Sequence, residues 1–450
     1  MLSVLRNRAY RHLFAAQVIA LAGTGLATVA LGLLAYDIAG AHAGSVLGTA
    51  LAIKMVAYVL IAPAVGAIAD RLPRRTLMVG ADLTRATVAL CLPFVDQVWQ
   101  VYVLIFLLQS ASAAFTPTFQ AVVPDVLPAE RDYTQALSLS RLAYDLESLF
   151  SPALAAALLS LITYNWLFLG TVAGFLASAA LVVSAVLPKT SPAADTDHTE
   201  PRTGNAYSKA TACTRLFFAV PQLRALLVLN LAVAAASATV TVNSVVYVRD
   251  QLGRGAADVS LALGAYGGGS MLVALLLPRV LARISDRTVM LCGALMLTVV
   301  FVALGVLTAV DSGGGRWPVL LVVWAAFGGA CSLVLTPTGR LVRRSAPPEQ
   351  RTSAFAAQFS LSHSCWLLTY PLAGWLGATA GLRWAVAVLG AITLAAGLIA
   401  VRLWPSRESA PVEHEHSGLR PDHPHLVDAV RAGNGWRHRH SLTGGLHAHP

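Results

Sequence analysis

The chain has 450 residues, of which 56% are hydrophobic and only 12% are charged, and its formal net charge is +10. Soluble domains carry about 25% charged residues, so this composition excludes an ordinary soluble protein and predicts one whose surface faces lipid. Because hydrocarbon cannot satisfy backbone N–H and C=O groups, the segments that cross the bilayer must be helices of about 20 apolar residues.

Apolar segments of this length follow one another along the whole chain. The first starts after Arg6, Arg8 and Arg11 and is too long for the apolar core of a cleavable signal sequence. We therefore expect an all-α membrane protein with twelve transmembrane helices. They cover roughly residues 12–38, 45–69, 76–95, 99–122, 133–161, 164–187, 222–248, 258–280, 287–310, 317–340, 352–378 and 382–404.

Two polar segments divide the chain. Residues 188–221 are rich in Pro, Thr, Asp and Ala, which is typical of a flexible linker. Residues 405–450 are rich in Pro, Gly and His and lack an apolar period, so we expect this tail to be disordered without a ligand. The prediction is an N-terminal six-helix half over 1–187, a linker, a C-terminal six-helix half over 222–404, and the tail.

The basic residues predict the orientation of these helices. Most Lys and Arg residues outside the helices fall on the side of the N-terminus, whereas the opposite loops hold only Arg249, Arg254, Arg316 and Arg383. The positive-inside rule therefore places both termini and the linker on the cytoplasmic side of a bacterial inner membrane. Topology accounts for the basic balance, so nucleic acid is not an expected partner.

An internal repeat relates the two halves. The segment TPTFQAVVPDVLPAER starts at Thr116, and TPTGRLVRRSAPPEQR starts at Thr336, 220 residues later. The segment RRTLMVGA from Arg74 likewise matches DRTVMLCG from Asp286, at an offset of 212. Two similar halves that rock around a shared cavity would give alternating access, so the expected fold has two pseudo-symmetric six-helix halves.

The helix over 133–161 carries charges deep in the membrane. Arg141 and Asp145 are four residues apart, so they lie on one face and can pair, either as part of a site or simply to hold helices together. Glu147 lies on another face with Tyr144, near mid-membrane, where a carboxyl group should bind a proton reversibly near neutral pH. It is our candidate for proton coupling, and a purely structural carboxyl group is the alternative.

Other buried charges are harder to assign. His363 is expected to face the same cavity, either as a hydrogen-bonded core residue or as a second proton carrier or metal relay. Lys54, Asp82 and Arg85 are interpreted as lying near helix ends, from which their side chains reach the interface. The chain contains neither a phosphate-binding G-x-x-x-x-G-K-[ST] loop nor a zinc-binding H-E-x-x-H, so we expect neither an ATP-driven pump nor an enzyme.

The tail holds eight of the twelve histidines, arranged as four His-x-His pairs. In an extended chain residues i and i+2 point to the same side, so each pair could hold one divalent ion such as Ni²⁺, Co²⁺, Zn²⁺ or Cu²⁺. Compositional drift or a purification addition would also produce histidines here. No permanently bound cofactor is expected; a metal would be transported or sensed. The candidate ligands are His414, His416, His423, His425, His438, His440, His447 and His449.

The loop GAIADRLPRRTLM resembles the signature of the major facilitator superfamily. The matching residues are Gly66, Asp70, Arg71, Arg74 and Arg75, and Pro73 stands where a glycine is usual. The resemblance implies that Asp70 faces the start of the helix over 352–378, near Thr352 and Ser353, in the outward-open state. There a carboxylate would stabilise the positive end of the helix.

Two longer segments, which begin VLRNRAYRHLF and VYVLIFLLQSA, resemble the nickel-resistance exporters of this superfamily. Those proteins also end in a histidine-rich cytoplasmic segment. The resemblance implies a proton-driven exporter of nickel or cobalt, which we expect to act as a monomer in the lipid bilayer. The alternatives are an exporter of a lipophilic drug or siderophore whose tail buffers metal, and a membrane-held metal sensor.

Overall fold

The computed structural model describes residues 2–39, 43–69, 72–159, 161, 163–187, 214–215, 217–309, 315–346, 350–404, 412–416, 430–432 and 435–440. Within these ranges it contains twelve long helices, which confirms the predicted all-helical membrane fold. The first six are α1 (Arg8–Ala39), α2 (Ala43–Ala69), α3 (Arg74–Cys91), α4 (Val98–Val126), α5 (Glu130–Leu159) and α6 (Tyr164–Ser184). The others are α8 (Pro221–Val246), α9 (Ala256–Val280), α10 (Asp286–Ala309), α11 (Arg316–Leu335), α13 (Arg351–Thr379) and α14 (Leu382–Leu403).

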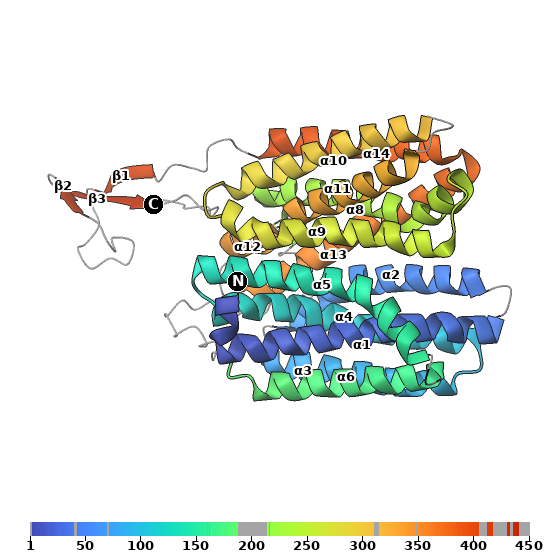
Figure 1. Ribbon diagram of the computed structural model, residues 1–450. Helices are drawn as coiled ribbons and strands as arrows, with labels where there is room; N and C mark the ends of the chain where they lie inside the picture. Colours follow the sequence, from blue (N-terminus) through green and yellow to red (C-terminus); the bar gives the residue numbers. More distant parts are fainter. Residues whose placement is uncertain are drawn as a thin grey trace.

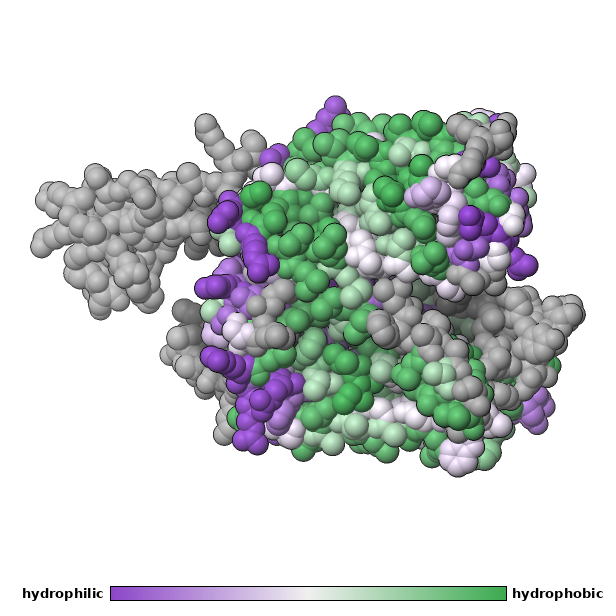
Figure 2. All heavy atoms as spheres, in the orientation of Figure 1, coloured by the Kyte–Doolittle hydropathy of each residue, from purple (hydrophilic) through white to green (hydrophobic). Residues whose placement is uncertain are grey.

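The surface of the helical bundle suits a bilayer. Among the described residues, nine helices are long and apolar enough to cross a membrane by length and composition. Large apolar side chains such as Leu295 and Val322 are 65% and 68% exposed, which is favourable only in lipid. Figure 2 shows the resulting hydrophobic belt between two more hydrophilic ends. The long helices α2, α5 and α13 are not among the nine, and they carry the polar residues described below.

The helices form two bundles that lie one above the other in Figure 1, α1–α6 in one and α8–α14 in the other. Their buried apolar residues form separate cores, one almost entirely from residues 217–404 and others from the first six helices. Within the second bundle α9 and α11 pack backbone to backbone. A Cβ added at Gly269 would lie 1.9 Å from the carbonyl oxygen of Ala325, so only glycine permits this approach.

The two copies of the TPT segment fold differently. In the first copy α4 continues through Pro117, whereas in the second α11 ends at Leu335 and a separate short helix, α12 (Thr338–Ser345), follows Pro337. The prediction of one helix over 317–340 was therefore wrong at its end. Proline lacks the backbone N–H that would continue the helical hydrogen bonds, so the chain can redirect here. The redirected helix α12 carries three arginines.

Short elements complete the fold. These are the 3-10 helices η1 (Leu2–Arg6) and η3 (Leu92–Phe94), and one π-helical turn, η4 (Tyr247–Gln251), that extends α8. The tail, for which the composition predicts disorder, contains strands β1 (Val412–His416), β2 (Val430–Ala432) and β3 (Gly435–His440). They form an antiparallel sheet in the order β1-β3-β2. The N-terminus and this sheet lie at the same end of the bundle, which we call the terminal end (Figure 1).

Candidate functional site

The two halves meet mainly along two helix pairs, α2 with α13 and α5 with α9, and α4 also packs against α13. A small apolar cluster of Ala62, Ala113 and Phe359 joins α2 and α4 of the first half to α13 of the second. Several of the polar residues singled out from the sequence, among them Lys54, Arg141 and His363, lie along these same pairs. The interface between the halves, which must rearrange if they rock, is therefore the candidate site.

Close backbone contacts hold α2 against α13. The Ser353 hydroxyl donates to the carbonyl oxygen of Gly66 at 2.8 Å, and the Ser360 hydroxyl donates to that of Val59 at 2.6 Å. A Cβ added at Gly66 would lie 2.9 Å from the Cβ of Ala356. Gly66 is thus required for this helix contact.

Lys54 lies at the centre of the α2–α13 interface, not at a helix end. Its ammonium nitrogen is 5.7 Å from the centroid of the Tyr58 ring, and its charge is close enough to interact with those of Glu147 and Tyr370. The Tyr58 hydroxyl donates to Oε1 of Gln109 at 3.0 Å. The interpretation of Lys54 as a residue that reaches the membrane surface was wrong, because the side chain points between the helices.

His363 of α13 lies against the same group of residues. Its Nδ1–H donates to the carbonyl oxygen of Phe359 at 2.7 Å. Its ring centroid lies 4.8 Å from that of Tyr58, 4.1 Å from that of Phe359 and 5.3 Å from that of Trp366. We call the four rings of Tyr58, Phe359, His363 and Trp366 the aromatic wall. It runs from α2 in the first half to α13 in the second.

Glu147 of α5 is half-buried and its charge interacts with that of Lys54. In the part of the chain that the structure describes, Glu147 forms no hydrogen bond or ion pair within 4.0 Å. Tyr144, one turn earlier, lies within hydrogen-bonding reach of Gln17 and Thr116. This side of α5 therefore faces the interior of the first half rather than lipid.

The opposite side of α5 carries a second polar group. Arg141 forms an ion pair of 2.9 Å with Asp145, as their spacing in the sequence suggests. The Ser270 hydroxyl of α9 accepts from Nε and Nη2 of Arg141 at 3.1 and 3.0 Å and donates to Asp145 at 2.6 Å. The pair is thus fixed to the other half of the molecule by one serine.

Asp82 and Arg85 also lie inside the protein rather than at helix ends. They form a buried ion pair, and Asp82 accepts a hydrogen bond of 2.8 Å from Ser178 of α6. The Arg85 guanidinium lies between the rings of Phe115 and Phe175, 4.5 and 4.6 Å from their centroids. Every contact is within the first half, so this pair holds α3, α4 and α6 together.

A small hollow lies between α1 and α4, with a cavity volume of about 30 Å³. Its lining comes from the first half alone and includes Thr24, Thr28, Leu108 and Gln109. Gln109 connects the hollow to the centre because it also accepts the hydrogen bond of Tyr58. The hollow is lined mostly by apolar side chains, and its volume is about that of one or two water molecules.

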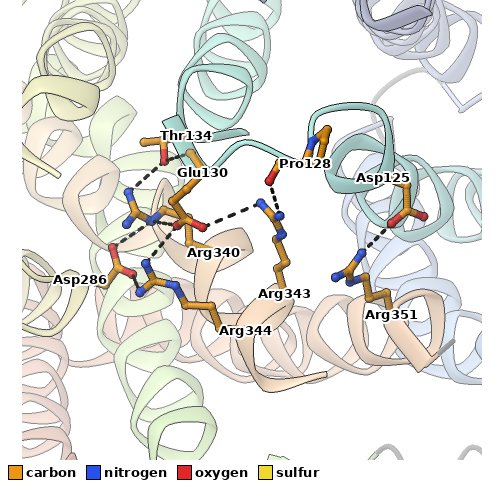
Figure 3. A network of polar contacts seen from close by, with 9 residues as sticks. All are labelled: Asp125, Pro128, Glu130, Thr134, Asp286, Arg340, Arg343, Arg344 and Arg351. Atoms are coloured by element: carbon orange, nitrogen blue, oxygen red, sulfur yellow. Dashed lines mark hydrogen bonds and ion pairs between the residues drawn. The ribbon is translucent and has the colours of Figure 1, made fainter. Parts of the chain in front are cut away.

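Ion pairs close the interface at the terminal end (Figure 3). Arg351 at the start of α13 pairs with Asp125 at the end of α4, with an N–O distance of 2.6 Å. Glu130 at the start of α5 pairs with Arg340 at 3.0 Å and with Arg344 at 3.1 Å, both on α12. Glu130 also lies 3.8 Å from Nη1 of Arg343. Among the described residues, every ion pair that joins the halves belongs to this group of Asp125, Glu130, Arg340, Arg343, Arg344 and Arg351. We call it the terminal latch.

The terminal latch shows how the two repeat copies have diverged. At the offset of 220 residues, Asp125 corresponds to Ser345 and Glu130 to Gln350, while Arg340 corresponds to Gln120. One copy therefore supplies the acids and the other the bases. Buried Asp286 supports the basic copy, with Oδ2 2.9 Å from Nη1 of Arg344. Sequence reasoning found both copies but missed that they face each other.

The signature loop is only partly described. Asp70 and Arg71 lie outside the described residues, and with them the expected contact of Asp70 with Thr352 and Ser353. Arg74 pairs with Asp125 and so contributes to the terminal latch, and Arg75 donates to the carbonyl oxygen of Ala185 after α6. Both arginines therefore bind neighbouring segments of the protein.

The tail histidines are divided between described and undescribed segments. His414 and His416 lie on β1, and His438 and His440 lie on β3, with His414 directly opposite His438 in the register. His423, His425, His447 and His449 lie outside the described residues. In the ranges that the structure describes, no group of three or more His, Cys, Asp or Glu side chains is placed to hold a metal.

Comparison with known proteins decides the family. The family model for the Major Facilitator Superfamily matches residues 13–253 and 225–441. The chain belongs to the major facilitator superfamily. Its members are membrane transporters and generally not enzymes, and the multi-pass helical fold agrees with this assignment.

Individual members of the superfamily match parts of the chain. Macrolide efflux protein A of Enterococcus faecalis is 29% identical over 153 residues, which is 32% of this chain and 47% of that protein. The protein of the same name from Streptococcus pyogenes is 30% identical over 149 residues, or 32% of this chain and 36% of that protein. The chain thus spans about half or less of the length of these relatives.

Solved structures show the same fold over most of the chain. The human organic anion transporter MFSD10 has a TM-score of 0.72 at 17% identity, covering 87% of this chain and 99% of that one. A bacterial homologue of the iron transporter ferroportin, in its outward-facing state, has a TM-score of 0.69 at 14% identity, covering 88% and 99%. At these identities the likeness concerns the superfamily fold alone.

Proposed function

We propose that the protein is a proton-coupled efflux transporter that exports a lipophilic organic compound by alternating access. The observation that carries the proposal is the place of Glu147. Its carboxyl group faces the interior of the first half, close enough to Lys54 for their charges to interact, and has no hydrogen bond or ion pair among the described residues. A carboxyl group so placed can exchange its proton for cargo, because no fixed partner holds its charge.

The surroundings of Glu147 support an organic cargo rather than a bare metal ion. The aromatic wall offers apolar contact area to a lipophilic molecule. The ammonium group of Lys54 would repel a divalent cation at the same centre. The matched relatives are named macrolide efflux proteins, which agrees with this choice.

The terminal latch suggests the state of the transport cycle. If the terminal end is cytoplasmic, as the distribution of basic residues predicts, the closed latch corresponds to an outward-facing state. A proton from outside would bind Glu147 as cargo leaves, and the halves would rock until the latch opens towards the cytoplasm. New cargo would then displace the proton inward, so that the proton gradient drives export.

A second candidate cargo is a divalent metal such as Ni²⁺ or Co²⁺, and the tail favours it. The register that places His414 opposite His438 brings two His-x-His pairs to neighbouring strands. Glu413 and Glu415 lie opposite Arg439 and Arg437, so the charged residues alternate with the histidines along both strands. Imidazole groups suit these metals, and the tail would capture them beside the latch.

Everted membrane vesicles with an imposed pH gradient can test both cargoes. Uptake of a radiolabelled macrolide and of radioactive nickel is measured for the wild type, Glu147→Gln and a truncation that removes residues 405–450, with lipid-facing Cys292→Ser as the control. We expect macrolide uptake by the wild type, the control and the truncation, and at least a tenfold loss in Glu147→Gln. Nickel uptake that requires the tail would favour the second candidate, and no uptake of either would overturn the proposal.

A further inference from the structure

Lys54 occupies a place in the centre that a cargo could use. We infer that its ammonium group is a tethered competitor, which holds the position that the positively charged group of a lipophilic organic cation takes when it binds. The inference rests on the proposed function only for the location of the cargo site. It adds the chemical class of the cargo, namely organic amines and quaternary cations.

The contacts of Lys54 are those of a replaceable occupant. Its ammonium nitrogen lies 5.7 Å from the Tyr58 ring centroid, within the distance of about 6 Å at which a cation is attracted to an aromatic face. Its charge also interacts with Glu147 on α5. Throughout the described residues it makes no hydrogen bond and no ion pair within 4.0 Å. Nothing specific therefore holds this ammonium group in place.

The surroundings of the ammonium group form a cation site. The aromatic wall supplies rings from both halves, and Tyr370 of α13 is within electrostatic reach as well. Aromatic faces with one carboxylate nearby are the arrangement that recognises alkylated ammonium groups. A cation bound here would contact α2, α5 and α13 together, so its arrival would change the interface between the halves.

The repeat shows that the loosely held cation is particular to this interface. At the offset of 212 residues, Lys54 corresponds to Tyr266 and Tyr58 to Ser270, both on α9. The α5–α9 interface also holds a cation, Arg141, but Asp145 and Ser270 bind it directly. One interface thus fixes its positive charge, and the other leaves its positive charge free to be displaced.

Charge balance limits what can displace it. Among the described residues the centre has one carboxylate, that of Glu147, for one ammonium group, so a cargo cation would add a second positive charge unless Lys54 moves away. The flexible side chain of lysine permits such a movement. A monovalent cation with a large apolar surface can offset the cost of moving Lys54 through its contacts with the aromatic wall, whereas a small hydrated ion cannot.

Equilibrium binding to the purified full chain in detergent tests the inference. Tetraphenylphosphonium is the cationic probe, and tetraphenylborate, which has nearly the same shape, is the anionic one. We expect Lys54→Met to bind tetraphenylphosphonium at least tenfold more tightly than the wild type, because the competing charge is gone. Lys54→Arg keeps the charge and should stay within threefold of the wild type. Arg283→Met removes an exposed charge at the terminal end and should change nothing.

Several outcomes would overturn the inference. These are an affinity for tetraphenylphosphonium that does not rise in Lys54→Met, no saturable binding to either protein, or saturable tetraphenylborate binding by the wild type that Lys54→Met loses. The last would make Lys54 a receptor for an anion. Because binding needs no proton gradient, the result is independent of the vesicle experiment. Tighter binding in Lys54→Met without any transport would support the cation site and count against proton-coupled export.

Discussion

The α5–α9 and α2–α13 interfaces occupy equivalent places in the two repeats but join the halves by different physical means. In the first, a buried ion pair is tied to the facing helix through Ser270. In the second, serine hydroxyls bind backbone carbonyl groups, and the charges of Lys54 and Glu147 are not in direct contact. The two repeats share one framework, but the α5–α9 interface holds its charges by direct bonds, whereas the charge at the α2–α13 interface can be exchanged.

This difference has consequences for a cycle in which the halves rock. Moving α9 away from α5 would remove the Ser270 hydroxyl from the Arg141–Asp145 pair and leave its charge-assisted hydrogen bonds unmade, which is unfavourable. The α5–α9 contact is therefore suited to a hinge that keeps its pair throughout the cycle. The α2–α13 contact has no such pair to lose, so cargo can enter beside it at a smaller cost.

The largest expected effect is on the ion pair. Asp145→Ala leaves the Arg141 guanidinium buried without its carboxylate, so we expect the free energy of unfolding to fall by about 3–5 kcal/mol. Thermal unfolding in detergent, followed by circular dichroism, measures it. Lys54→Ala at the other interface should change stability by less than about 1 kcal/mol, since Lys54 has no direct partner among the described residues. Equal losses at the two positions would contradict the comparison.

The next effect concerns the helix contact at Gly66. A Cβ at this position would lie 2.9 Å from the Cβ of Ala356, so Gly66→Ala forces α2 away from α13 at the terminal end. Overpacking of this kind destabilises by about 1–3 kcal/mol. A cysteine introduced at Ser353, in a variant without the natural cysteines, should be labelled faster when α2 moves away from α13, so its labelling rate measures the opening.

Gly80 provides a matched control for Gly66. It also lies in a long helix, but a Cβ added there would meet nothing within 4 Å. Gly80→Ala should leave the labelling rate unchanged and raise stability slightly, because alanine favours a helix over glycine by about 0.5–1 kcal/mol. The same labelling rate in both variants would show that close packing at Gly66 does not hold the terminal end closed.

Much of this architecture could be predicted from periodicity and spacing. The apolar segments predict the twelve helices because each must satisfy its backbone within lipid, and a spacing of four residues predicts that Arg141 and Asp145 can pair. Which helix faces which could not be predicted, because contacts between distant segments leave no period in the sequence. The interpretation of Lys54 and Arg85 as helix-end residues was wrong for this reason.

The terminal latch shows the same limit in another form. The repeated TPT segments could be aligned from the sequence, and their opposite charges were visible in the letters. That the acids of one copy contact the arginines of the other depends on the turn after Pro337 and on the crossing of the two halves. Pairing across the halves is a property of the folded molecule, not of either segment alone.

A smaller effect is expected at Glu130, which contacts three arginines of the terminal latch but is 43% exposed. Exposed ion pairs contribute about 0.2–1 kcal/mol each, so Glu130→Gln should favour the opened latch by about 1 kcal/mol. Labelling at the Ser353→Cys position should be about fivefold faster in Glu130→Gln than in the protein that keeps Glu130. The difference should be smaller in 1 M salt, because salt screens the ion pairs of Glu130. Neighbouring Asp132→Asn removes a similar charge that forms no ion pair among the described residues, so it should have no effect.

The smallest effect tests whether the serine contacts of the exchangeable interface hold the halves together individually. Ser360 donates to the Val59 carbonyl of the other half, whereas Ser364, one turn later, donates only to the backbone of its own helix at Ser360. A neutral hydrogen bond contributes about 0.5–1.5 kcal/mol, and within α2 the Val59 carbonyl has no partner four residues later because Pro63 lacks an N–H, so Ser360→Ala should lose about 1 kcal/mol. Ser364→Ala should lose nothing, because its bond duplicates one within the helix. Thermal unfolding of both variants measures the two losses of stability. A larger loss in Ser364→Ala than in Ser360→Ala would show that hydrogen bonds within α13, not those between the halves, stabilise the α2–α13 contact.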